Sequence, residues 1–236
     1  MKLLVWNIQQ GGGRRRERIA AAIIAHNPDI VALIEFVPTT AEPLLQRLRL
    51  AGFTHQICTT RNGFDYAICV ISKTPISTRP SGIPTLDDSG LWLEVSVPAH
   101  EFNVGVVHVP VGPRTRMKAF LSALVQVALS RGGDPFLFVG DFNTGIGPAD
   151  GPINNYGDVD RFMAIQGAGF TDEWRHMHGD LVEHTYTFPR TGKQYRIDHA
   201  LASAGLLPRV RCCRYSHEER LEGASDHSVL VVEIGD

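Results

Sequence analysis

The chain has 236 residues, of which 43% are hydrophobic and 20% charged, and its formal net charge is −2. Folding at this length buries roughly 70% of the unfolded surface, and no linker or change of composition divides the sequence, so we expect one domain over residues 1–236. A charge this close to zero excludes a global field that attracts polyanions, so any affinity for nucleic acid must come from a local basic patch.

The first half of the chain predicts strands that alternate with helices and then a hairpin. Residues 2–8 form a strand, and a glycine-rich loop at 9–13 leads into a helix over 14–27, where apolar residues recur at helical spacing. The elements expected after this helix are a strand at 29–36, a helix at 41–51, and a hairpin of strands 55–60 and 66–72 around a turn at 61–63.

The second half of the chain predicts mainly short strands. Strands at 91–97 and 102–109 precede an amphipathic helix at 114–131. The elements expected after residue 143 are a loop at 144–158, a helix at 158–169, and strands at 171–176, 185–188, 195–201, 209–215 and 228–234. About ten short strands with few helices indicate two packed sheets flanked by helices, and they argue against a doubly wound parallel sheet.

The segment Phe136-Leu137-Phe138-Val139-Gly140-Asp141-Phe142-Asn143 is an apolar run that stops on an acid. The run indicates a strand buried on both faces, and a carboxylate at its end is costly to desolvate without a partner. Asn143 lies two residues on, on the same side of an extended chain. One interpretation is a functional site. The other is an Asx-type turn, in which both side chains only satisfy backbone groups.

Five other apolar runs also meet polar residues at one end. These residues are Asn7 after 3–6, Glu35 after 30–34, His108 after 104–107, Asp198 with His199 after 195–197, and Asp226 with His227 before 228–234. Strand ends are where rigid scaffolds display functional side chains. We therefore expect the six segments to share one cleft.

The motifs at these positions point to a known superfamily. They are Trp-Asn-Ile at 6–8, Ala-Leu-Ile-Glu at 32–35, Val-His-Val-Pro at 107–110, Gly-Asp-Phe-Asn at 140–143, Ile-Asp-His at 197–199 and Ser-Asp-His at 225–227. In this order they resemble the endonuclease/exonuclease/phosphatase superfamily, which includes DNase I, exonuclease III-type enzymes, inositol-polyphosphate 5-phosphatases and neutral sphingomyelinases. The resemblance runs over residues 2–234 and implies an α/β fold, a four-layer α/β/β/α sandwich whose two mixed, mainly antiparallel sheets pack face to face.

Three of these residues offer oxygen ligands for a cation. Glu35 is a hard oxygen donor, and Asn7 and Asp226 can supply or support others. Such a set suits Mg²⁺ or Mn²⁺ better than zinc. Bound to a phosphate oxygen, the ion would neutralise charge that develops during an in-line displacement. We therefore predict Mg²⁺ as the cofactor, with Mn²⁺ as a substitute.

The other residues predict the proton chemistry. Asp141, held by Asn143, is the candidate that orients and deprotonates the attacking water. A lone His227 would suit a core histidine, but Asp198 can fix its tautomer and favour the imidazolium, which would stabilise a phosphorane-like oxygen. The resemblance to DNase-like members implies that His108 is a second donor to the phosphate.

Arginines are the candidates for contacts with further substrate phosphates. Those in loops after strands, in turns or at helix starts are Arg14, Arg15, Arg16, Arg61, Arg114 and Arg116. Positive charges in the first turn of a helix oppose its dipole, so the run at 14–16 lacks a local structural reason. A solvated charged face is the alternative explanation.

The cysteines bear on the cellular compartment. Cys58, Cys69, Cys212 and Cys213 form no CxxC pair and no zinc spacing. Cys58 and Cys69 could face each other across a hairpin, but we expect four reduced thiols. No apolar run approaches the roughly 20 residues that cross a bilayer, and residues 1–6 are too short for a signal sequence. We predict a soluble, cytoplasmic monomer with no membrane span.

The function predicted first is a Mg²⁺-dependent phosphodiesterase, a nuclease acting on nucleic acid. The first alternative keeps this chemistry for a small phosphate ester or a lipid head group. A non-catalytic binding module is the second, and it predicts a replaced catalytic position, of which the sequence has none. Many abasic-site endonucleases carry an acid where this chain has Gln9 and an aromatic residue where it has His108, which argues against a dedicated abasic-site role.

Overall fold

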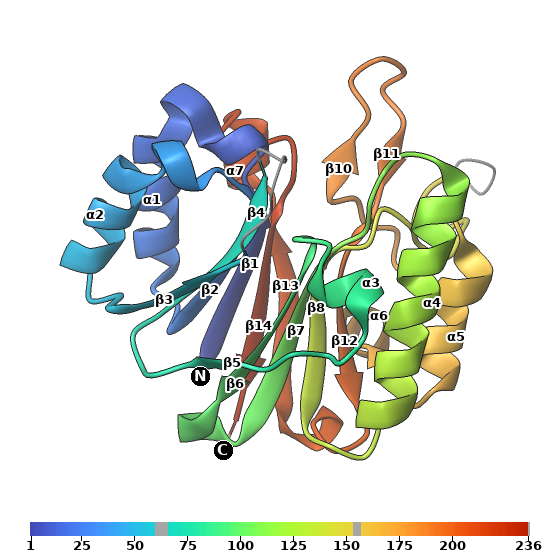
Figure 1. Ribbon diagram of the computed structural model, residues 1–236. Coiled ribbons are helices and arrows are strands. Elements are labelled where there is room, and N and C mark those ends of the chain that lie inside the picture. Colours follow the sequence, from blue (N-terminus) through green and yellow to red (C-terminus); the bar gives the residue numbers. More distant parts are fainter. Residues whose placement is uncertain (60–65, 153–156, 236) are drawn as a thin grey trace.

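Two six-stranded sheets lie face to face in the computed structural model, which describes residues 1–59, 66–152 and 157–235 (Figure 1). The first sheet contains, in spatial order, β13 (Val210–Ser216), β14 (Val229–Ile234), β1 (Lys2–Asn7), β2 (Ile30–Phe36), β4 (Ala67–Ser72) and β3 (His55–Cys58). The second contains β5 (Ser77–Thr78), β6 (Trp92–Val97), β7 (Phe102–His108), β8 (Phe136–Asp141), β12 (Asp198–Ser203) and β9 (Phe170–Asp172).

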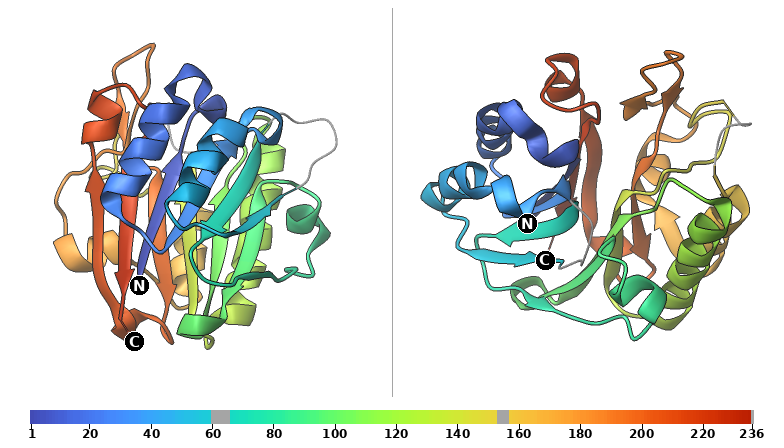
Figure 2. Two further views of the ribbon diagram at one scale, coloured as in Figure 1. Left: turned by 90° about the vertical axis from the view of Figure 1, so that its left-hand side faces the viewer. Right: turned by 45° about the horizontal axis from the view of Figure 1, so that its top comes forward.

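The strand directions confirm mixed, mainly antiparallel sheets. Among the described neighbours, β1–β2 and β7–β8 are parallel and the other pairs are antiparallel. Helices α1 (Arg16–His26) and α2 (Glu42–Leu50) cover the outer face of the first sheet. Helices α3 (Pro84–Asp87), α4 (Arg114–Arg131) and α5 (Val159–Gly167) cover that of the second (Figure 2). The predicted four-layer α/β/β/α sandwich is confirmed.

The apolar run of β8 is continuous because helices cover one of its faces and the other sheet covers the opposite one. Leu137 and Val139 join the core between the sheets, whereas Phe136 and Phe138 pack in the layer under α4. Alternate residues of a strand point to opposite faces, so a strand buried on both sides carries no polar residue within its length. The first polar residue, Asp141, comes where the strand ends.

Strand register aligns three polar residues at the end of the second sheet. Asp141 of β8 pairs directly with His108 of β7 on one side and with Asp198 of β12 on the other. Gly140 keeps β8 close to β7, since its φ is 136° and a Cβ there would lie 2.1 Å from the carbonyl oxygen of Val107. Glycine is therefore the residue that this approach permits.

Two predicted strands are wrong in part. The strand expected at 171–176 stops after β9, and helix α6 (Glu173–His178) begins because the Asp172 carboxylate accepts a hydrogen bond from the backbone N–H of Arg175 (3.1 Å). The strand expected at 195–201 is interrupted. Its first residues form β11 (Gln194–Tyr195), which pairs with β10 (Tyr186–Thr187) as a separate two-stranded sheet.

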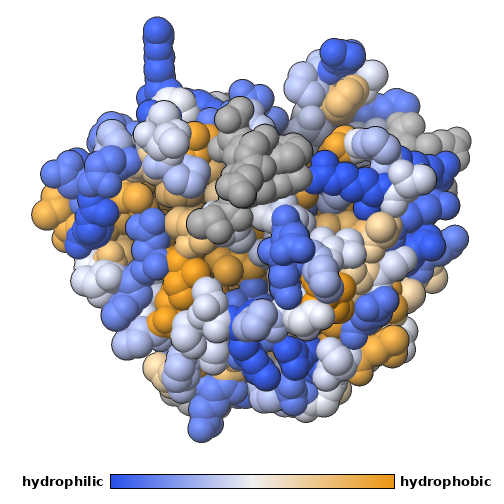
Figure 3. Space-filling view, in the orientation of Figure 1, coloured by the Kyte–Doolittle hydropathy of each residue, from blue (hydrophilic) through white to orange (hydrophobic). Residues whose placement is uncertain are grey.

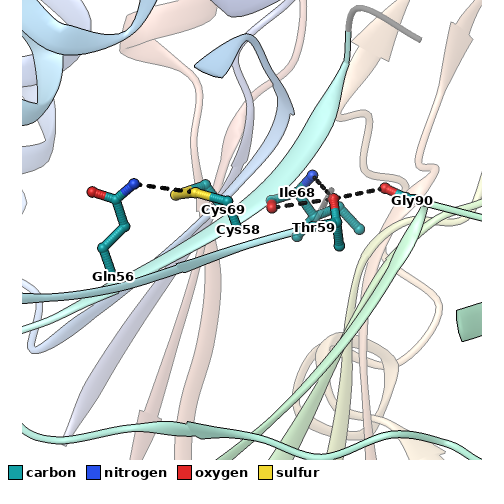
Figure 4. Close-up of a disulfide and its surroundings, with 6 residues drawn as sticks. All are labelled: Gln56, Cys58, Thr59, Ile68, Cys69 and Gly90. Carbon is teal, nitrogen blue, oxygen red and sulfur yellow. Dashed lines mark hydrogen bonds between the residues drawn. A yellow bond between two sulfur atoms is a disulfide. The ribbon is translucent and has the colours of Figure 1, made fainter. Parts of the chain in front are cut away.

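The expectation of four reduced thiols is wrong for one pair. Cys58 and Cys69 face each other in the β3–β4 hairpin, with Cα atoms 4.1 Å apart, and form a disulfide (Figure 4). Cys212 and Cys213 are free. Direct pairing across antiparallel strands brings the two sulfurs within bonding reach. The disulfide gives no support to a cytoplasmic location, which stays a prediction. The hairpin turn with Arg61 lies outside the described residues.

The first and last strands of the chain are neighbours in one sheet. β1 pairs with β14, and the amino group of Met1 donates to the carbonyl oxygen of Ile234 (2.8 Å). β1 begins and β14 ends at the pole opposite the β10–β11 hairpin (Figure 1). In the described part of the chain, we find no helix with the length and apolar composition that a membrane span requires.

A buried charged cluster ties the loop after β8 to α6 and β12. The guanidinium of Arg196, 1% exposed, donates to Asp150 and to Asp172, both at 2.7 Å. Beside it Glu173 is fully buried, and neither of its carboxylate oxygens has a hydrogen-bond partner among the described residues. Burial, with a smaller contribution from Asp172, raises the pKa of Glu173 to about 8.

The raised pKa of Glu173 predicts a pH-dependent stability. The folded chain keeps a proton on Glu173 between pH 4.5 and about 8 that the unfolded chain releases, so the free energy of unfolding falls as pH rises through this range. Glu173→Gln stays neutral and should unfold like the wild type at pH 4.5 but be more stable at pH 8. Urea unfolding across this range measures the difference, with the exposed Glu222→Gln as the control. Parallel stability curves for wild type and Glu173→Gln would contradict the assignment.

Candidate active site

A cleft of about 540 Å³ opens where the two sheets meet the β10–β11 hairpin. Six of the predicted residues line it: Glu35, His108, Asp141, Asn143, Asp226 and His227. In the space-filling view the outline of the molecule is notched between the hairpin and the α1 side (Figure 3). The six lining residues come from four of the six segments. The other two segments supply Asn7 and Asp198, which bond Asp141 and His227. The distant segments therefore converge, as the strand-end pattern predicts.

Asn7 joins the two sheets at the floor of the cleft. Its side-chain amide donates to Glu35 Oε1 (3.2 Å) on the first sheet and to Asp141 Oδ2 (3.1 Å) on the second. Its side-chain oxygen Oδ1 accepts from the backbone N–H of Gln9 (3.0 Å). Asn7 is 1% exposed, so it is placed to fix the two carboxylates and not to contact a large ligand.

Asp141 lies at the centre of the site. Its Oδ1 accepts from the backbone N–H of Asn143 (2.9 Å), and the Asn143 amide in turn donates to the carbonyl oxygen of Val109 (2.8 Å). The Asx-type turn is thus present within the cleft itself, and the two interpretations of the Asp141–Asn143 pair do not exclude each other. Burial raises the pKa of Asp141 to about 7, against the lowering effect of His227.

Two imidazole rings flank the Asp141 carboxylate. Nε2 of His108 and Nε2 of His227 each lie 3.9 Å from Asp141 Oδ2. The other ring nitrogen of His227, Nδ1, bonds Asp198 Oδ2 at 2.9 Å. Burial lowers the pKa of His227, but the carboxylates of Asp198 and Asp141 outweigh it and raise that pKa to about 10. His227 is therefore an imidazolium whose free N–H faces the cleft, whereas burial lowers the pKa of His108.

Glu35 reaches the cleft through an irregularity in β2. The pairing of β2 with β4 shifts register between Leu33 and Phe36, and Glu35 has a φ of 57°. Its Oε2 accepts from the backbone N–H of Gln10 (2.8 Å). A non-glycine residue in this conformation is strained and persists only where its surroundings fix it. The bulge turns a carboxylate out of the strand and into the site.

Glu35 and Asp226 form the set that fits a divalent cation best. Asp226 Oδ2 accepts from Gln9 Nε2 (2.9 Å), whereas its Oδ1 is buried without a hydrogen-bond partner among the described residues. Burial raises the pKa of Asp226, and the charge of Glu35 adds to this effect. An unpartnered anionic oxygen in the same cleft as a second carboxylate matches the hard oxygen ligands that Mg²⁺ prefers.

A second combination also brings possible ligand atoms together. Asp141, Asp198 and His227 offer atoms within 4.8 Å of one another, a possible metal site. However, His227 donates Nδ1–H to Asp198 and carries the raised pKa, and an imidazolium has no lone pair for a metal. This group is better satisfied by its own hydrogen bonds than by an ion.

The arginine run has tertiary partners that sequence reasoning missed. The Arg15 guanidinium donates to the carbonyl oxygens of Ala224 and Gln9 (both 2.7 Å). Arg16 donates to the carbonyl oxygen of Gly11 (3.1 Å) and to Thr40. The Arg15–Ala224 bond holds the glycine-rich turn η1 (Gln10–Arg15) against the segment before His227. Contacts of the run with phosphate stay a prediction.

The remaining predicted arginines occupy different surroundings. Arg14 is exposed, as are Arg114 and Arg116 in the first turn of α4. The positive charge of Arg116 also lowers the pKa of His108, by less than burial does. Arg61 lies outside the described residues. Among these residues, the electrostatic influence on His108 connects Arg116 to the site.

Tyr186 is a site residue that the sequence did not reveal. Its ring packs on that of His227, with centroids 4.8 Å apart and planes tilted by 33°. Tyr186, Phe188 and Tyr195 of the hairpin give the cleft an aromatic wall, and Lys193 lies beside them. The alternation of Tyr186 and Phe188 predicts a strand in this segment, but only the fold places that strand against His227.

The comparisons with known proteins agree with this geometry. The profile of the Endonuclease/Exonuclease/phosphatase family matches residues 4–227. An AP endonuclease from Archaeoglobus fulgidus has a similar structure, with a TM-score of 0.84, 19% identity and 99% of each chain covered. The 3′ phosphatase NExo from Neisseria, bound to a product DNA hairpin, is similar at a TM-score of 0.81, with 21% identity and 100% of both chains covered.

A further solved structure is that of the 3′-5′ exonuclease NExo from Neisseria meningitidis. Its TM-score is 0.79, with 21% identity and 100% of both chains covered. Among curated proteins, none matches the chain at a significant level. At these identities the likeness of the solved structures shows the shared fold.

The Asp198 contact predicts the protonation of His227. Asp198→Asn removes the carboxylate that favours the imidazolium and should lower the pKa of His227 by roughly 1–3 pH units. Nitrogen-detected NMR titration of the histidine rings in the presence of EDTA measures this value. Asp160→Asn, at an exposed carboxylate on α5, is the control and should leave His227 unchanged. An unaltered pKa in Asp198→Asn would mean that the 2.9 Å contact does not set the charge of the ring.

Proposed function

Because the chain belongs to the endonuclease/exonuclease/phosphatase family and is a hydrolytic phosphoesterase, we propose that it is a nuclease that uses Mg²⁺ to cleave phosphodiester bonds of nucleic acid. The observation that carries this proposal is the arrangement around Asp141 Oδ2. Two imidazoles approach this one oxygen from the cleft side, and an unpartnered oxygen of Asp226 lies in the same cleft.

Glu35 and Asp226 would hold the cation, with Asn7 fixing the Glu35 carboxylate. When bound, the ion supplies charge neutralisation at a phosphate oxygen and at the leaving oxygen. Mn²⁺, which also accepts oxygen ligands, would substitute for Mg²⁺. The orphaned Asp226 Oδ1 supports this assignment, because a buried charged oxygen without a partner is costly unless a ligand completes it.

The chain's own residues would move the protons. Asp141, held from two sides by Asn7 and the backbone of Asn143, accepts a proton from the attacking water. The water then attacks phosphorus in line with the leaving oxygen. The Nε2–H of His227, oriented by Asp198, donates to a phosphoryl oxygen as the negative charge on that oxygen grows. His108 is a second hydrogen-bond donor to the same phosphoryl group, from the other side.

Nucleic acid is favoured as the substrate by the aromatic wall of the cleft. Tyr186, Phe188 and Tyr195 present aromatic surface, with Phe188 39% exposed, and Lys193 adds a cation. Aromatic side chains stack on bases of any sequence while a cation accompanies the backbone. The Neisseria 3′ phosphatase, a protein with this fold, binds a product DNA hairpin. The alternative is a small phosphate ester or a lipid head group in the same site.

Digestion of closed circles would test the reaction. With Mg²⁺ present, we expect the enzyme to cleave at least one of three substrates: circular single-stranded DNA, circular double-stranded DNA and RNA. EDTA should abolish this activity. Glu35→Gln, which retains size but removes the charge, should reduce the rate by roughly 10²-fold or more. Glu101→Gln, at an exposed acid far from the cleft, is the matched control. Full Mg²⁺-dependent activity in Glu35→Gln would refute the metal assignment.

Salt dependence separates the two substrate classes. An enzyme that follows a chain of phosphates loses affinity steeply as salt rises, because bound counterions are released. The Michaelis constant for nucleic acid should therefore rise strongly between 50 and 200 mM salt, as it does for proteins with several phosphate contacts, on the order of 10-fold or more. The corresponding constant for bis(4-nitrophenyl) phosphate should change little. Equal, weak salt effects on both substrates would favour the small-ester alternative.

A further inference from the structure

A second hollow, of about 360 Å³, adjoins the cleft. Asp226 lines both of them, so they meet at this residue. Strand β10 forms a common wall, with Tyr186 on the cleft side and Thr187 on the side of the second hollow. Neighbouring residues of a strand point in opposite directions, which places the two hollows on the two sides of one strand.

Arg220 lines the second hollow from the short helix α7 (Glu218–Leu221). Its Nε donates to the hydroxyl of Ser228 (2.9 Å) and one terminal nitrogen donates to that of Thr187 (3.0 Å). Both acceptors are neutral, and no carboxylate of the described residues lies within ion-pair distance of Arg220. A guanidinium has five N–H donors, so this fixed side chain keeps donors for a ligand.

Arg15 adds a second uncompensated charge to the same hollow. Its guanidinium is held by backbone carbonyl oxygens, and within the described ranges it too has no carboxylate partner. Two guanidinium groups therefore oppose the single carboxylate of Asp226 in the lining of the hollow. Half-buried arginines fixed by neutral groups form a preorganised site for an anion, and the planar guanidinium matches the geometry of phosphate.

We propose that the second hollow binds the phosphate next to the reacting one in a nucleic-acid strand, and that Arg220 is its contact residue. The inference rests on the proposed function, because it assumes a polymer whose reacting phosphate lies between His108 and His227. A nucleic-acid strand in that position crosses the β-strand β10. The phosphate next to the reacting one then reaches the second hollow, on the Thr187 side of β10. An ester with a single phosphate would leave the hollow empty.

Short oligonucleotides test directly how many phosphates of a ligand the protein binds. Four ligands are compared by calorimetry in EDTA: a thymidine dinucleotide with one phosphate, the trinucleotide with two, and the two trinucleotides in which one linkage or the other is an uncharged methylphosphonate. We expect the wild type to bind the trinucleotide about tenfold more tightly than at least one methylphosphonate form, since one charge-assisted contact is lost. Equal affinity for the trinucleotide and both methylphosphonate forms would overturn the inference.

Arg220→Gln should remove this preference. The variant is expected to bind the trinucleotide and its methylphosphonate forms equally, and Arg220→Lys, which keeps the charge, should retain part of the difference. Arg211→Gln, at an exposed arginine of β13 near the chain ends, is the matched control and should behave like the wild type. If Arg220→Gln weakened all ligands by one factor, Arg220 would act only by holding β10, and the proposed subsite would be wrong.

The outcomes also separate this inference from the proposed function. Failure of the wild type to bind any of the ligands and to cut any nucleic acid would overturn both. Cleavage of nucleic acid together with equal affinity for charged and methylphosphonate trinucleotides would overturn the subsite alone. Because each comparison uses two ligands on the same protein, partial misfolding of a variant would not imitate the expected result.

Discussion

The register of β7, β8 and β12 is the constraint on which the site depends. It sets His108, Asp141 and Asp198 side by side where three strands end. Side chains alternate along a strand, so a shift of one residue in either pairing would turn a site residue to the opposite face. The apolar faces of β8 prevent such a shift, because one set of residues packs between the sheets and the other packs under α4. Core packing thus fixes the register of the strands and, with it, which side chains reach the site.

The site belongs to neither sheet alone. Asn7 bonds a carboxylate on each sheet, and the His227 imidazolium, from the first sheet, bonds Asp198 on the second. Buried charges are tolerated when they are paired and hydrogen-bonded, and here the partners come from opposite sheets. Charge balance therefore helps to hold the sheets in one relative position. The same contacts that satisfy these groups also give Asp141 and His227 their shifted pKa values.

The fold and most of the candidate site follow from the sequence, because a polar residue at the end of an apolar run is a local pattern. What the sequence reasoning missed is of two kinds: two misses are local, and two depend on contacts between distant segments. The helix after Asp172 is set by a cap that competes with a strand pattern. The Cys58–Cys69 bond depends on which residues pair across a hairpin. Arg15 looked like a free cation, since its carbonyl acceptors come from other parts of the chain. Tyr186 gained its place only through the packing of β10 on His227.

Because β1 and β14 are neighbours, the shape of the enzyme does not require the elements to follow one another along the chain in their present order. Met1 and Ile234 are hydrogen-bonded at the pole away from the cleft. A short linker across this gap, with new ends opened at the exposed Gly52 between α2 and β3, would give a circularly permuted chain with every strand pairing intact. The six polar segments would then be synthesised in a different sequence and still meet in the same place. Their chemistry depends on where strands terminate in space and not on the order in which the segments follow one another along the chain.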